Sequence, residues 1–273
     1  MTARTDPPLR AVALVGDHLR HRWYAGRLAD ESAIDLRGVV SERHPPQPRG
    51  ATPDEDALVV EHFDQRRQAE ERYFGSAADW AELDVPFLAV GRGDTNTDRI
   101  AAWVRAREPE YLLLFGCGII RAPLLDLFAG RIVNIHLGLS PYYRGHATNF
   151  WPLVHGEPEC VGATVHLATL EVDAGAILRQ ARPAMTPADN AHDIGCKALI
   201  AGAEVLLAAL PEYAHGGLRP VPQPPGGKVY RHKDFEAAPG AAITELRRRF
   251  SEGMIPEYLA HKPVRDERFL IVE

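Results

Sequence analysis

Short apolar runs alternate with amphipathic stretches over the first half of the chain, and this alternation constrains the fold more than any other feature. Each run is rich in β-branched residues or leucine, as in a buried strand, and the stretches between the runs carry helical periodicity. Alternating strands and helices predict an α/β, doubly wound fold with a mostly parallel sheet and ligand sites at the carboxyl ends of its strands. The expected strands are Arg10–Gly16, Ile34–Val40, Pro86–Val90, Tyr111–Gly116 and Arg131–His136, and the expected helices are Asp17–Asp30, Asp54–Leu83, Asp98–Glu108 and Pro123–Phe128.

The second half of the chain has a different pattern. Val161–Thr169 and Ala176–Pro183 are extended runs joined by a short connection, so we expect antiparallel or mixed strands at one edge of the sheet. A helix over Ala188–Leu210 has an apolar face suited to packing on the sheet. We place the main domain at residues 1–210, with a flexible loop at about 41–53, and a proline-rich linker with a short C-terminal extension that docks on the core at 211–273.

Charge and cysteine usage argue against several classes of protein. The 273 residues include 31 basic and 37 acidic ones, a net charge of −6, so we expect no nucleic acid partner. Three widely spaced cysteines favour a reducing compartment. The N-terminus lacks a signal-peptide pattern, and Tyr111–Ile120 is about half the length that a membrane span needs. We therefore expect a soluble protein that is cytoplasmic and has no membrane partner.

The segment after the fifth expected strand carries the chemistry. Asn134 and His136 are two residues apart on a strand, so their side chains share one face, and a Gly/Pro-containing loop follows at once. Transfer of an acyl group to an amine needs donors at the developing oxyanion and a route for the surplus proton of the amine. Asp173, in the tight turn Val172–Gly175, is the candidate carboxylate for orienting the imidazole or accepting that proton.

Three ordered motifs carry a resemblance to a known family. They are Asn134-x-His136 with the following Ser140-Pro141-Tyr-Tyr-Arg-Gly145, then Gly162–His166, then Asp173–Gly175. Together they resemble the folate-dependent formyltransferases, which include glycinamide ribonucleotide, methionyl-tRNA and sugar-amine N-formyltransferases. The resemblance covers about residues 110 to 185 and implies a Rossmann-like formyltransferase domain over residues 1–210.

The resemblance also implies roles for individual residues and a co-substrate, 10-formyltetrahydrofolate. Asn134, His136 and Asp173 would form the catalytic trio. Main-chain groups of two loops would hold the pterin of the donor, so their side chains need not be polar. The residues of these loops are Gly116, Cys117, Gly118, Ile119, Ile120, Arg121, Thr169, Leu170 and Val172.

The sequence departs from the family in one loop. The usual His-Pro-Ser-Leu-Leu-Pro run appears as His136-Leu-Gly-Leu-Ser-Pro141, so Gly138 and Ser140 replace the serine and the second leucine. We expect the acceptor to be the amine of a small molecule, best a nucleotide-linked amino sugar. The alternatives are a purine-precursor or specialised-metabolite amine, or a non-catalytic folate-binding module of the same fold. A homodimer is also possible.

Other polar residues have simpler interpretations. His166 is expected to be a hydrogen-bonded core histidine, and Cys117 a buried, inert thiol. His18 and His21 are expected on an exposed basic helix face. No zinc-type spacing is found, so no metal is expected. The backbone amides after Gly16 could still present a helix N-terminus to an acceptor phosphate.

Overall fold

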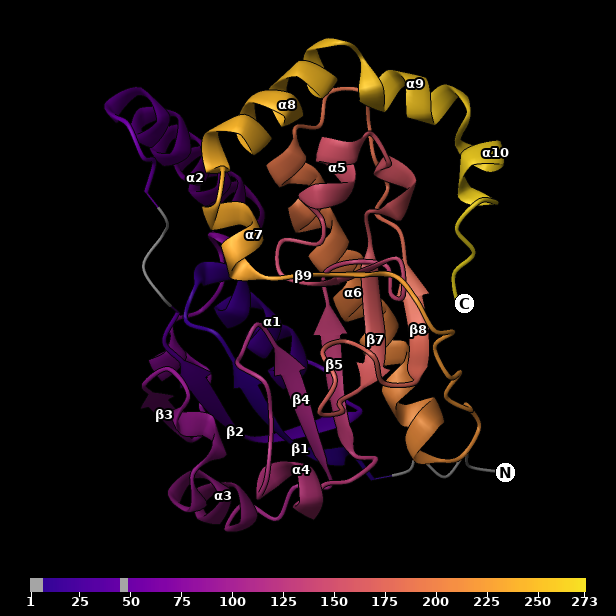
Figure 1. The fold of residues 1–273 in the computed structure, drawn as a ribbon. Coiled ribbons are helices and arrows are strands. Elements are labelled where there is room, and N and C mark those ends of the chain that lie inside the picture. The colour runs from indigo at the N-terminus through magenta and orange to yellow at the C-terminus, as the bar shows by residue number, and fades with distance from the viewer. Residues whose placement is uncertain (1–6, 45–48) are drawn as a thin grey trace.

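The structure is a layered α/β fold built on one seven-stranded sheet (Figure 1). It is a computed structural model, and it describes residues 7–44 and 49–273. The strand order is β3-β2-β1-β4-β5-β7-β8. The bounds are β1 Leu9–Val15, β2 Ile34–Glu42, β3 Phe87–Val90, β4 Tyr111–Phe115, β5 Ile132–His136, β7 Ala163–Leu167 and β8 Ile177–Ala181.

Strand direction divides the sheet into two parts. The strands β3, β2, β1, β4 and β5 are parallel to their neighbours, whereas β7 runs antiparallel to both β5 and β8. The doubly wound, mostly parallel fold predicted from the sequence is thereby confirmed. The chain winds outward from β1 to β3 and then crosses back to β4, so the strand order reverses between β1 and β4. A crevice outside the carboxyl ends of the strands is expected at such a point.

Helices cover both faces of the sheet, which explains why the central strands are apolar throughout. The helices α1 (Leu19–Ala29) and α6 (Ala191–Ala214) share a core with Ala11, Ala13 and Val15 of β1. On the opposite face, α3 (Asp98–Arg105) and α4 (Leu124–Leu127) pack with Val12 and Leu14, as the alternation of side chains along a strand requires (Figure 1).

The longest helix, α6, begins after Asn190, whose side chain accepts hydrogen bonds from the backbone N–H groups of His192 and Asp193. It continues four residues past the predicted end at Leu210. Among the described residues it is the one helix that is long and apolar enough to cross a membrane, and half of its most apolar window is buried. It packs against β7 and β8, which is the arrangement of a core helix.

The C-terminal residues share a second core with the main domain. The strand β9 (Lys228–Tyr230) pairs in parallel with β6 (Tyr143–Gly145), and α8 packs on α2 and α5. Ile243 and Leu246 of α8 are buried with Val59 of α2. The extension therefore forms part of the wall above the sheet (Figure 1). The helix bounds are α2 Pro53–Phe74, α5 Trp151–His155, α7 His232–Glu236, α8 Pro239–Ser251, α9 Met254–Ala260 and α10 Lys262–Asp266.

Three sequence predictions differ from the structure. The long helix ends at Phe74, where Gly75 follows, and a separate 3-10 helix covers Trp80–Glu82, with others at Asp94–Asn96 and Pro158–Cys160. The short pair β6 and β9 was not predicted, because three-residue strands carry no periodic signal. The loop predicted at 41–53 is shorter, since residues 41 and 42 complete β2 and are buried, and α2 begins at residue 53. Residues 45–48 of this loop lie outside the described residues.

Candidate active site

Two neighbouring strands present four polar residues at the carboxyl end of β5. Asn134 and His136 of β5 pair with His166 and Thr164 of the antiparallel strand β7. The side chains of Asn134 and His166 meet, because directly opposed residues of an antiparallel pair share a face. The Asn134 Nδ2 atom lies 3.0 Å from Nε2 of His166. The strand register therefore brings an amide and a second imidazole together.

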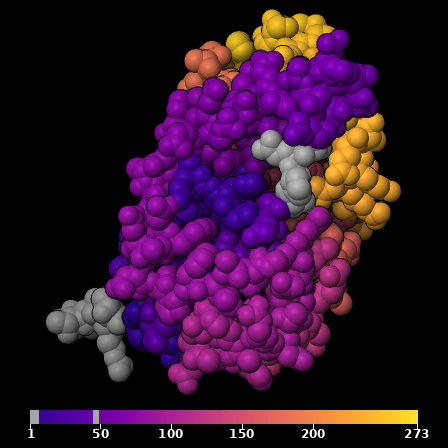
Figure 2. Space-filling view, turned by 90° about the vertical axis from the view of Figure 1, so that its left-hand side faces the viewer, coloured from indigo at the N-terminus to yellow at the C-terminus, as the bar shows by residue number. Residues whose placement is uncertain are grey.

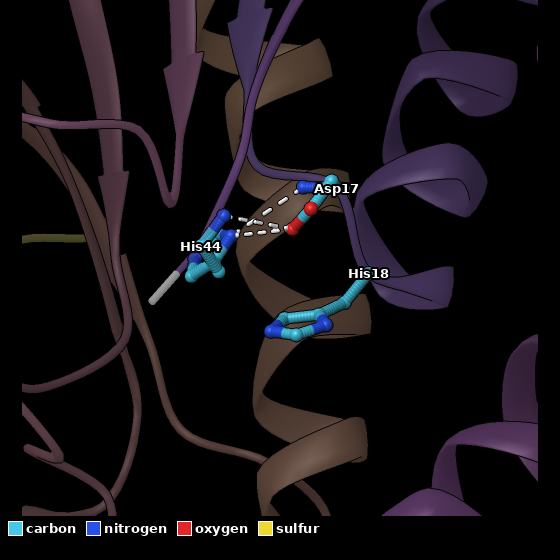
Figure 3. Close-up of side chains that lie close together, drawn as sticks. All are labelled: Asp17, His18 and His44. Carbon is cyan, nitrogen blue, oxygen red and sulfur yellow. Dashed lines mark hydrogen bonds and ion pairs between the residues drawn. The ribbon is translucent and has the colours of Figure 1, made fainter. Parts of the chain in front are cut away.

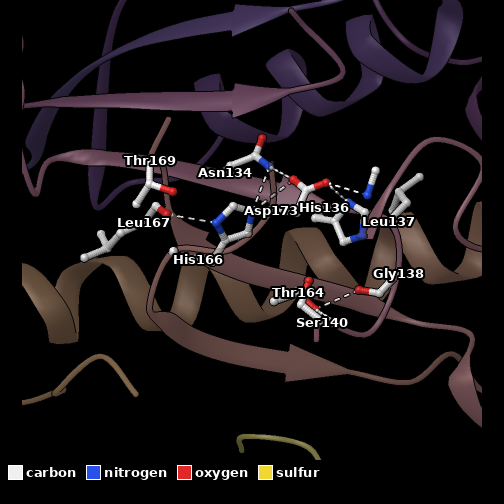
Figure 4. Close-up of polar contacts among 12 residues, drawn as sticks. Asn134, His136, Leu137, Gly138, Ser140, Thr164, His166, Leu167, Thr169 and Asp173 are labelled. Carbon is white, nitrogen blue, oxygen red and sulfur yellow. Dashed lines mark hydrogen bonds and ion pairs between the residues drawn. The ribbon is translucent and has the colours of Figure 1, made fainter. Parts of the chain in front are cut away.

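Asp173 reaches this cluster from the turn between β7 and β8. Its backbone has a φ of +48°, in the left-handed region that aspartate tolerates better than most residues. The Asp173 Oδ2 atom lies 3.1 Å from His136 Nδ1 and accepts a 2.9 Å hydrogen bond from the Gly145 N–H. The Asp173 Oδ1 atom lies 3.4 Å from Asn134 Nδ2. The structure thus brings together all three predicted trio residues (Figure 4).

The charge state of Asp173 follows from its neighbours. Burial by itself raises the pKa of Asp173, but the neighbouring His136 and His166 and the backbone N–H of Gly145 together hold that pKa well below its usual range. The carboxylate is therefore ionised at neutral pH.

His136 lies between two oxygen atoms. Its Nδ1 faces the carboxylate of Asp173, and its Nε2 lies 2.9 Å from the carbonyl oxygen of Tyr143. Burial lowers the pKa of His136, while Asp173 and the Tyr143 carbonyl act in the opposite direction. A neutral imidazole has only one N–H for these two acceptors. When the ring is doubly protonated, both N–H groups can donate, one to Asp173 and one to the Tyr143 carbonyl oxygen.

His166 contacts the trio, a position that the sequence analysis did not predict. It is buried and hydrogen-bonded as expected, with Nδ1 2.9 Å from the carbonyl oxygen of Leu167. That bond makes Nδ1 the N–H and leaves the Nε2 lone pair to accept from Asn134. Its Nε2 is also 3.4 Å from Asp173. The signal that could have revealed it is its expected place on the strand pairing with β5.

A large cavity of about 830 Å³ opens beside this cluster. Its size lies within the usual range of small-molecule sites. Figure 2 shows a hollow on one face of the molecule, with C-terminal atoms along one side. Leu170 is 66% exposed and does not line the cavity. The lining includes the trio and the other predicted donor-binding residues: Gly116, Cys117, Gly118, Ile119, Ile120, Arg121, Thr169 and Val172.

Main-chain groups of the 116–121 segment already have partners within the chain. The Gly118 N–H donates to Glu42, which also accepts from the Gly93 N–H, each at 2.6 Å. Asn96 donates to the Ile119 carbonyl oxygen at 2.9 Å and accepts from the Arg121 N–H at 2.7 Å. Glu42 and Asn96 therefore hold the predicted donor-binding segment in place, and neither was singled out from the sequence.

The Gly138 replacement has a steric reason. A Cβ atom at this position would lie 2.6 Å from Nε2 of His136 and 2.7 Å from Cβ of Thr148. The second replacement, Ser140, has its N–H bonded to Oγ1 of Thr164 at 3.0 Å and its carbonyl oxygen bonded to Gln180 at 2.7 Å. The loop is therefore packed directly against the imidazole of the trio.

The first helix differs from its prediction. His21 is fully buried rather than exposed, and burial together with the neighbouring Arg20 lowers its pKa well below the ordinary value. The backbone N–H of His18 donates to His21 Nδ1, and that of Asp17 lies 3.4 Å from His44 Nδ1. The His18 amide therefore has a partner within the chain, which argues against its binding a phosphate. Cys117 is half-buried rather than buried as predicted, yet desolvation of its thiol still raises its pKa to about 12, as expected of an unreactive thiol.

The fold and the cluster define a class of protein: a doubly wound α/β protein with an amide, imidazole and carboxylate at the carboxyl ends of its strands, beside a small-molecule cavity. Residues 35–210 match the family described as Formyl transferase. The chain belongs to this formyl transferase family, as its motifs indicate.

Known relatives agree with this assignment. Methionyl-tRNA formyltransferase from Myxococcus xanthus (strain DK1622) is 34% identical over 153 residues, covering 53% of this chain and 49% of the relative. The methionyl-tRNA formyltransferase from Streptococcus uberis (strain ATCC BAA-854 / 0140J) is 32% identical over 149 residues, which are 52% of this chain and 46% of the relative. The chain thus spans about half the length of the curated relatives it matches.

Solved structures share the fold. Phosphoribosylglycinamide formyltransferase from Anaplasma phagocytophilum superposes with a TM-score of 0.57 at 19% identity, covering 82% of this chain and 98% of that one. The formyltransferase PseJ from Anoxybacillus kamchatkensis, solved in complex with UDP-4,6-dideoxy-4-formamido-L-AltNAc and tetrahydrofolate, has a TM-score of 0.52 at 16% identity, covering 86% and 97%. At these identities the likeness establishes the fold alone.

Proposed function

We propose that this protein transfers a formyl group from 10-formyltetrahydrofolate to the amine of a small molecule. The observation that carries the proposal is the convergence of Asn134, His136 and Asp173 on one edge of the cavity, with Asp173 contacting both other residues. Membership of the formyl transferase family supports it. We place the folate against the cavity wall formed by residues 116–121, Thr169 and residues 171–173.

Asn134 is proposed to stabilise the oxyanion of the tetrahedral intermediate. Its Nδ2 carries two hydrogens, directed at His166 Nε2 at 3.0 Å and at Asp173 Oδ1 at 3.4 Å. The longer of these two bonds is weak, so a developing oxyanion can replace it without cost to the other. His166 then holds the amide of Asn134, while the other hydrogen of that amide donates to the oxyanion oxygen of the intermediate.

Asp173 and His136 are proposed to take up the proton that the amine loses. Attack of the amine nitrogen on the formyl carbon forms the new C–N bond, and the amine loses one proton to this pair. That proton passes to the folate nitrogen as its bond to the formyl carbon breaks, so tetrahydrofolate leaves carrying an N–H. The two oxygen atoms that flank His136 stabilise its doubly protonated form. Asp173 therefore supports the charge that appears on the imidazole during proton transfer.

The acceptor is proposed to be a small amine, with a nucleotide-linked amino sugar first. The formamido sugar bound in the PseJ structure and the net charge of −6 support a small acceptor over a tRNA. The named activity of the curated relatives favours methionyl-tRNA as the second candidate. A cytoplasmic location and a homodimer remain predictions.

A panel assay tests the proposal. Purified protein is incubated with 10-formyltetrahydrofolate and a set of amino sugars, purine precursors, metabolite amines and methionyl-tRNA, and products are examined by mass spectrometry for the gain of one CO. We expect tetrahydrofolate release that depends on one class of amine. Release without any amine would indicate a hydrolase, and folate binding without turnover would indicate a binding module; both would contradict the proposal.

Substitutions test the trio. Asn134→Ala, His136→Ala and Asp173→Ala should each lower turnover by about a hundred- to thousand-fold, the usual effect of losing one oxyanion donor. His261→Ala is the matched control, because the exposed side chain of His261 lies outside the cavity and contacts the carbonyl oxygen of Glu257. Near-normal turnover in any trio variant would remove that residue from the mechanism.

A further inference from the structure

A second cluster of polar side chains lies at the carboxyl ends of β1 and β2. Asp17 and His18 follow β1, and His44 follows β2, 27 positions after Asp17. One ligand atom from each residue lies within 4.8 Å of the other two. Figure 3 shows the Asp17 carboxylate joined to His44, with the ring of His18 beside them. Parallel pairing of β1 and β2 brings these two loops together.

The backbone is shaped around this cluster. A Cβ atom at Gly16 would lie 1.9 Å from Cε1 of His44 and 2.6 Å from Cε1 of His21, so only glycine leaves room for the rings here. The His44 N–H donates to Asp17 Oδ1 at 3.1 Å, and the His18 N–H donates to His21 Nδ1 at 3.0 Å. His21 is fully buried, and its Nε2 has no hydrogen-bond partner in the described chain. The two ligand-bearing loops are therefore fixed before any ion binds.

We propose that Asp17, His18 and His44 form a site for a divalent transition-metal ion, with Zn²⁺ as the best fit. Two imidazoles and one carboxylate are the protein ligands of open zinc sites. Zinc bonds of about 2.0–2.1 Å require donor atoms about 3.3 Å apart, and the shortest distance here, 2.9 Å from His44 Nδ1 to Asp17 Oδ1, is already close to that. The His18 ligand atom lies within 4.8 Å of the other two, so binding requires a side-chain rotation that shortens these distances.

The proton balance of binding is simple. In the absence of a metal, His44 Nδ1 and Asp17 Oδ1 share a proton. The ion takes the place of that proton, and His44 then carries its single proton on Nε2. Both imidazoles bind as neutral ligands and Asp17 binds as a carboxylate, so the site contributes one negative charge.

The site opens onto the same cavity as the trio. His18 and His44 both line that cavity, as do Arg20, Arg66 and Glu70. Glu70 forms ion pairs with both arginines, which leaves one net positive charge beside the cluster. A bound dication adds to this positive charge, so its free coordination positions favour water, hydroxide or an anionic oxygen of a molecule in the cavity. The site thus goes beyond the proposed formyl transfer and does not require it.

Metal binding is tested on the untagged, full-length protein. The protein is treated with a chelator, dialysed against Zn²⁺ and analysed by inductively coupled plasma mass spectrometry. We expect about one Zn²⁺ per chain, and at least a 100-fold weaker affinity in Asp17→Ala and His44→Ala, since losing even an outer partner of a metal ligand costs about 10- to 100-fold. His261→Ala is the matched control and should bind like the unaltered protein.

Co²⁺ replaces Zn²⁺ as a spectroscopic probe of the ligands. Visible bands without a thiolate charge-transfer band are expected, because the three ligands carry no sulfur. A thiolate band would place the ion on a cysteine and overturn the proposal.

Equal Zn²⁺ content in the unaltered protein and in the Asp17→Ala/His44→Ala double variant would overturn the proposal as well. His44→Asn, which keeps a polar side chain of moderate size, and circular dichroism of each variant separate loss of the site from loss of the fold. None of these measurements uses folate or an amine, so failure here leaves the proposed formyl transfer untouched.

Discussion

Gly138→Ala offers the sharpest test of how the trio is held. The added Cβ would lie 2.6 Å from Nε2 of His136 and 2.7 Å from Cβ of Thr148. Non-bonded heavy atoms of this kind are normally at least about 3.5 Å apart. Either the imidazole or the loop must therefore move by about 0.9 Å. His136 cannot move that far without losing contacts, because its Nε2 lies 2.9 Å from the Tyr143 carbonyl oxygen.

The expected magnitudes follow from this displacement. A shift of about 1 Å at a catalytic group costs about 100-fold in rate. Inserting a methyl group into a packed site costs about 1–3 kcal/mol of stability, which corresponds to a fall in melting temperature of roughly 2–12 °C for a chain of this size. We therefore expect a folded protein with about 100-fold lower turnover and a modestly lower melting temperature.

Two measurements check the expectation: thermal unfolding, and turnover with the acceptor found in the panel assay. Gly26→Ala in α1 is the matched control, because its added Cβ would meet only Leu83 Cδ2 at 3.8 Å. Alanine within a helix should be neutral or stabilise that control. Unchanged turnover and melting temperature in Gly138→Ala would refute the idea that this loop fixes His136.

Three further predictions concern stability and the support of the trio. Ion pairs with two arginines outweigh burial and lower the pKa of Glu70 to about 2. The contribution of Glu70 to stability is therefore complete above its ordinary pKa of 4.5 and is lost as the pH falls toward 2. In a plot of melting temperature against pH, Glu70→Gln should flatten the fall between pH 4.5 and pH 2, and an unchanged fall would contradict this prediction. Arg265→Ala removes the 2.6 Å ion pair of the fully buried Glu159 and should lower the free energy of unfolding in denaturant by about 3–5 kcal/mol. Adding Glu159→Gln should restore part of this loss, and a loss under about 1 kcal/mol, the value of a surface pair, would refute the prediction. His166→Ala removes the acceptor that orients Asn134, so kcat should fall while the KM for the folate changes little, and an unchanged kcat would show that the amide is held by other groups.

Much of the fold could be predicted from the sequence because its strands are buried on both faces. The run at Tyr111–Phe115 is apolar throughout since helices cover it on either side. The strand pair β6 and β9 escaped prediction, because each strand has three residues and is held by pairing with the other, distant strand rather than by a local pattern. The break after Phe74 escaped for a similar reason, as residues on both sides of Gly75 have helical propensity.

The site divides in the same way. The three trio residues could be predicted from the sequence. Asn134 and His136 are two apart on a strand and so share a face, and the tight turn around Asp173 fixes where its carboxylate projects. The burial of His21 and the position of His166 beside Asn134 depend on which strands and helices become neighbours, and a single sequence does not specify this.

The sequence by itself determined the seven strands of the main sheet, the helices between them, the family and the residue types of the trio, since these rest on local periodicity and motif spacing. Only the tertiary structure decided that His44 meets Asp17 and His18, that Gly138 must lack a side chain, and that α7 of the C-terminal extension lines the cavity. The physical reason is that each of these depends on distances between segments far apart in the chain, which are set by the packing of the whole sheet and its helices.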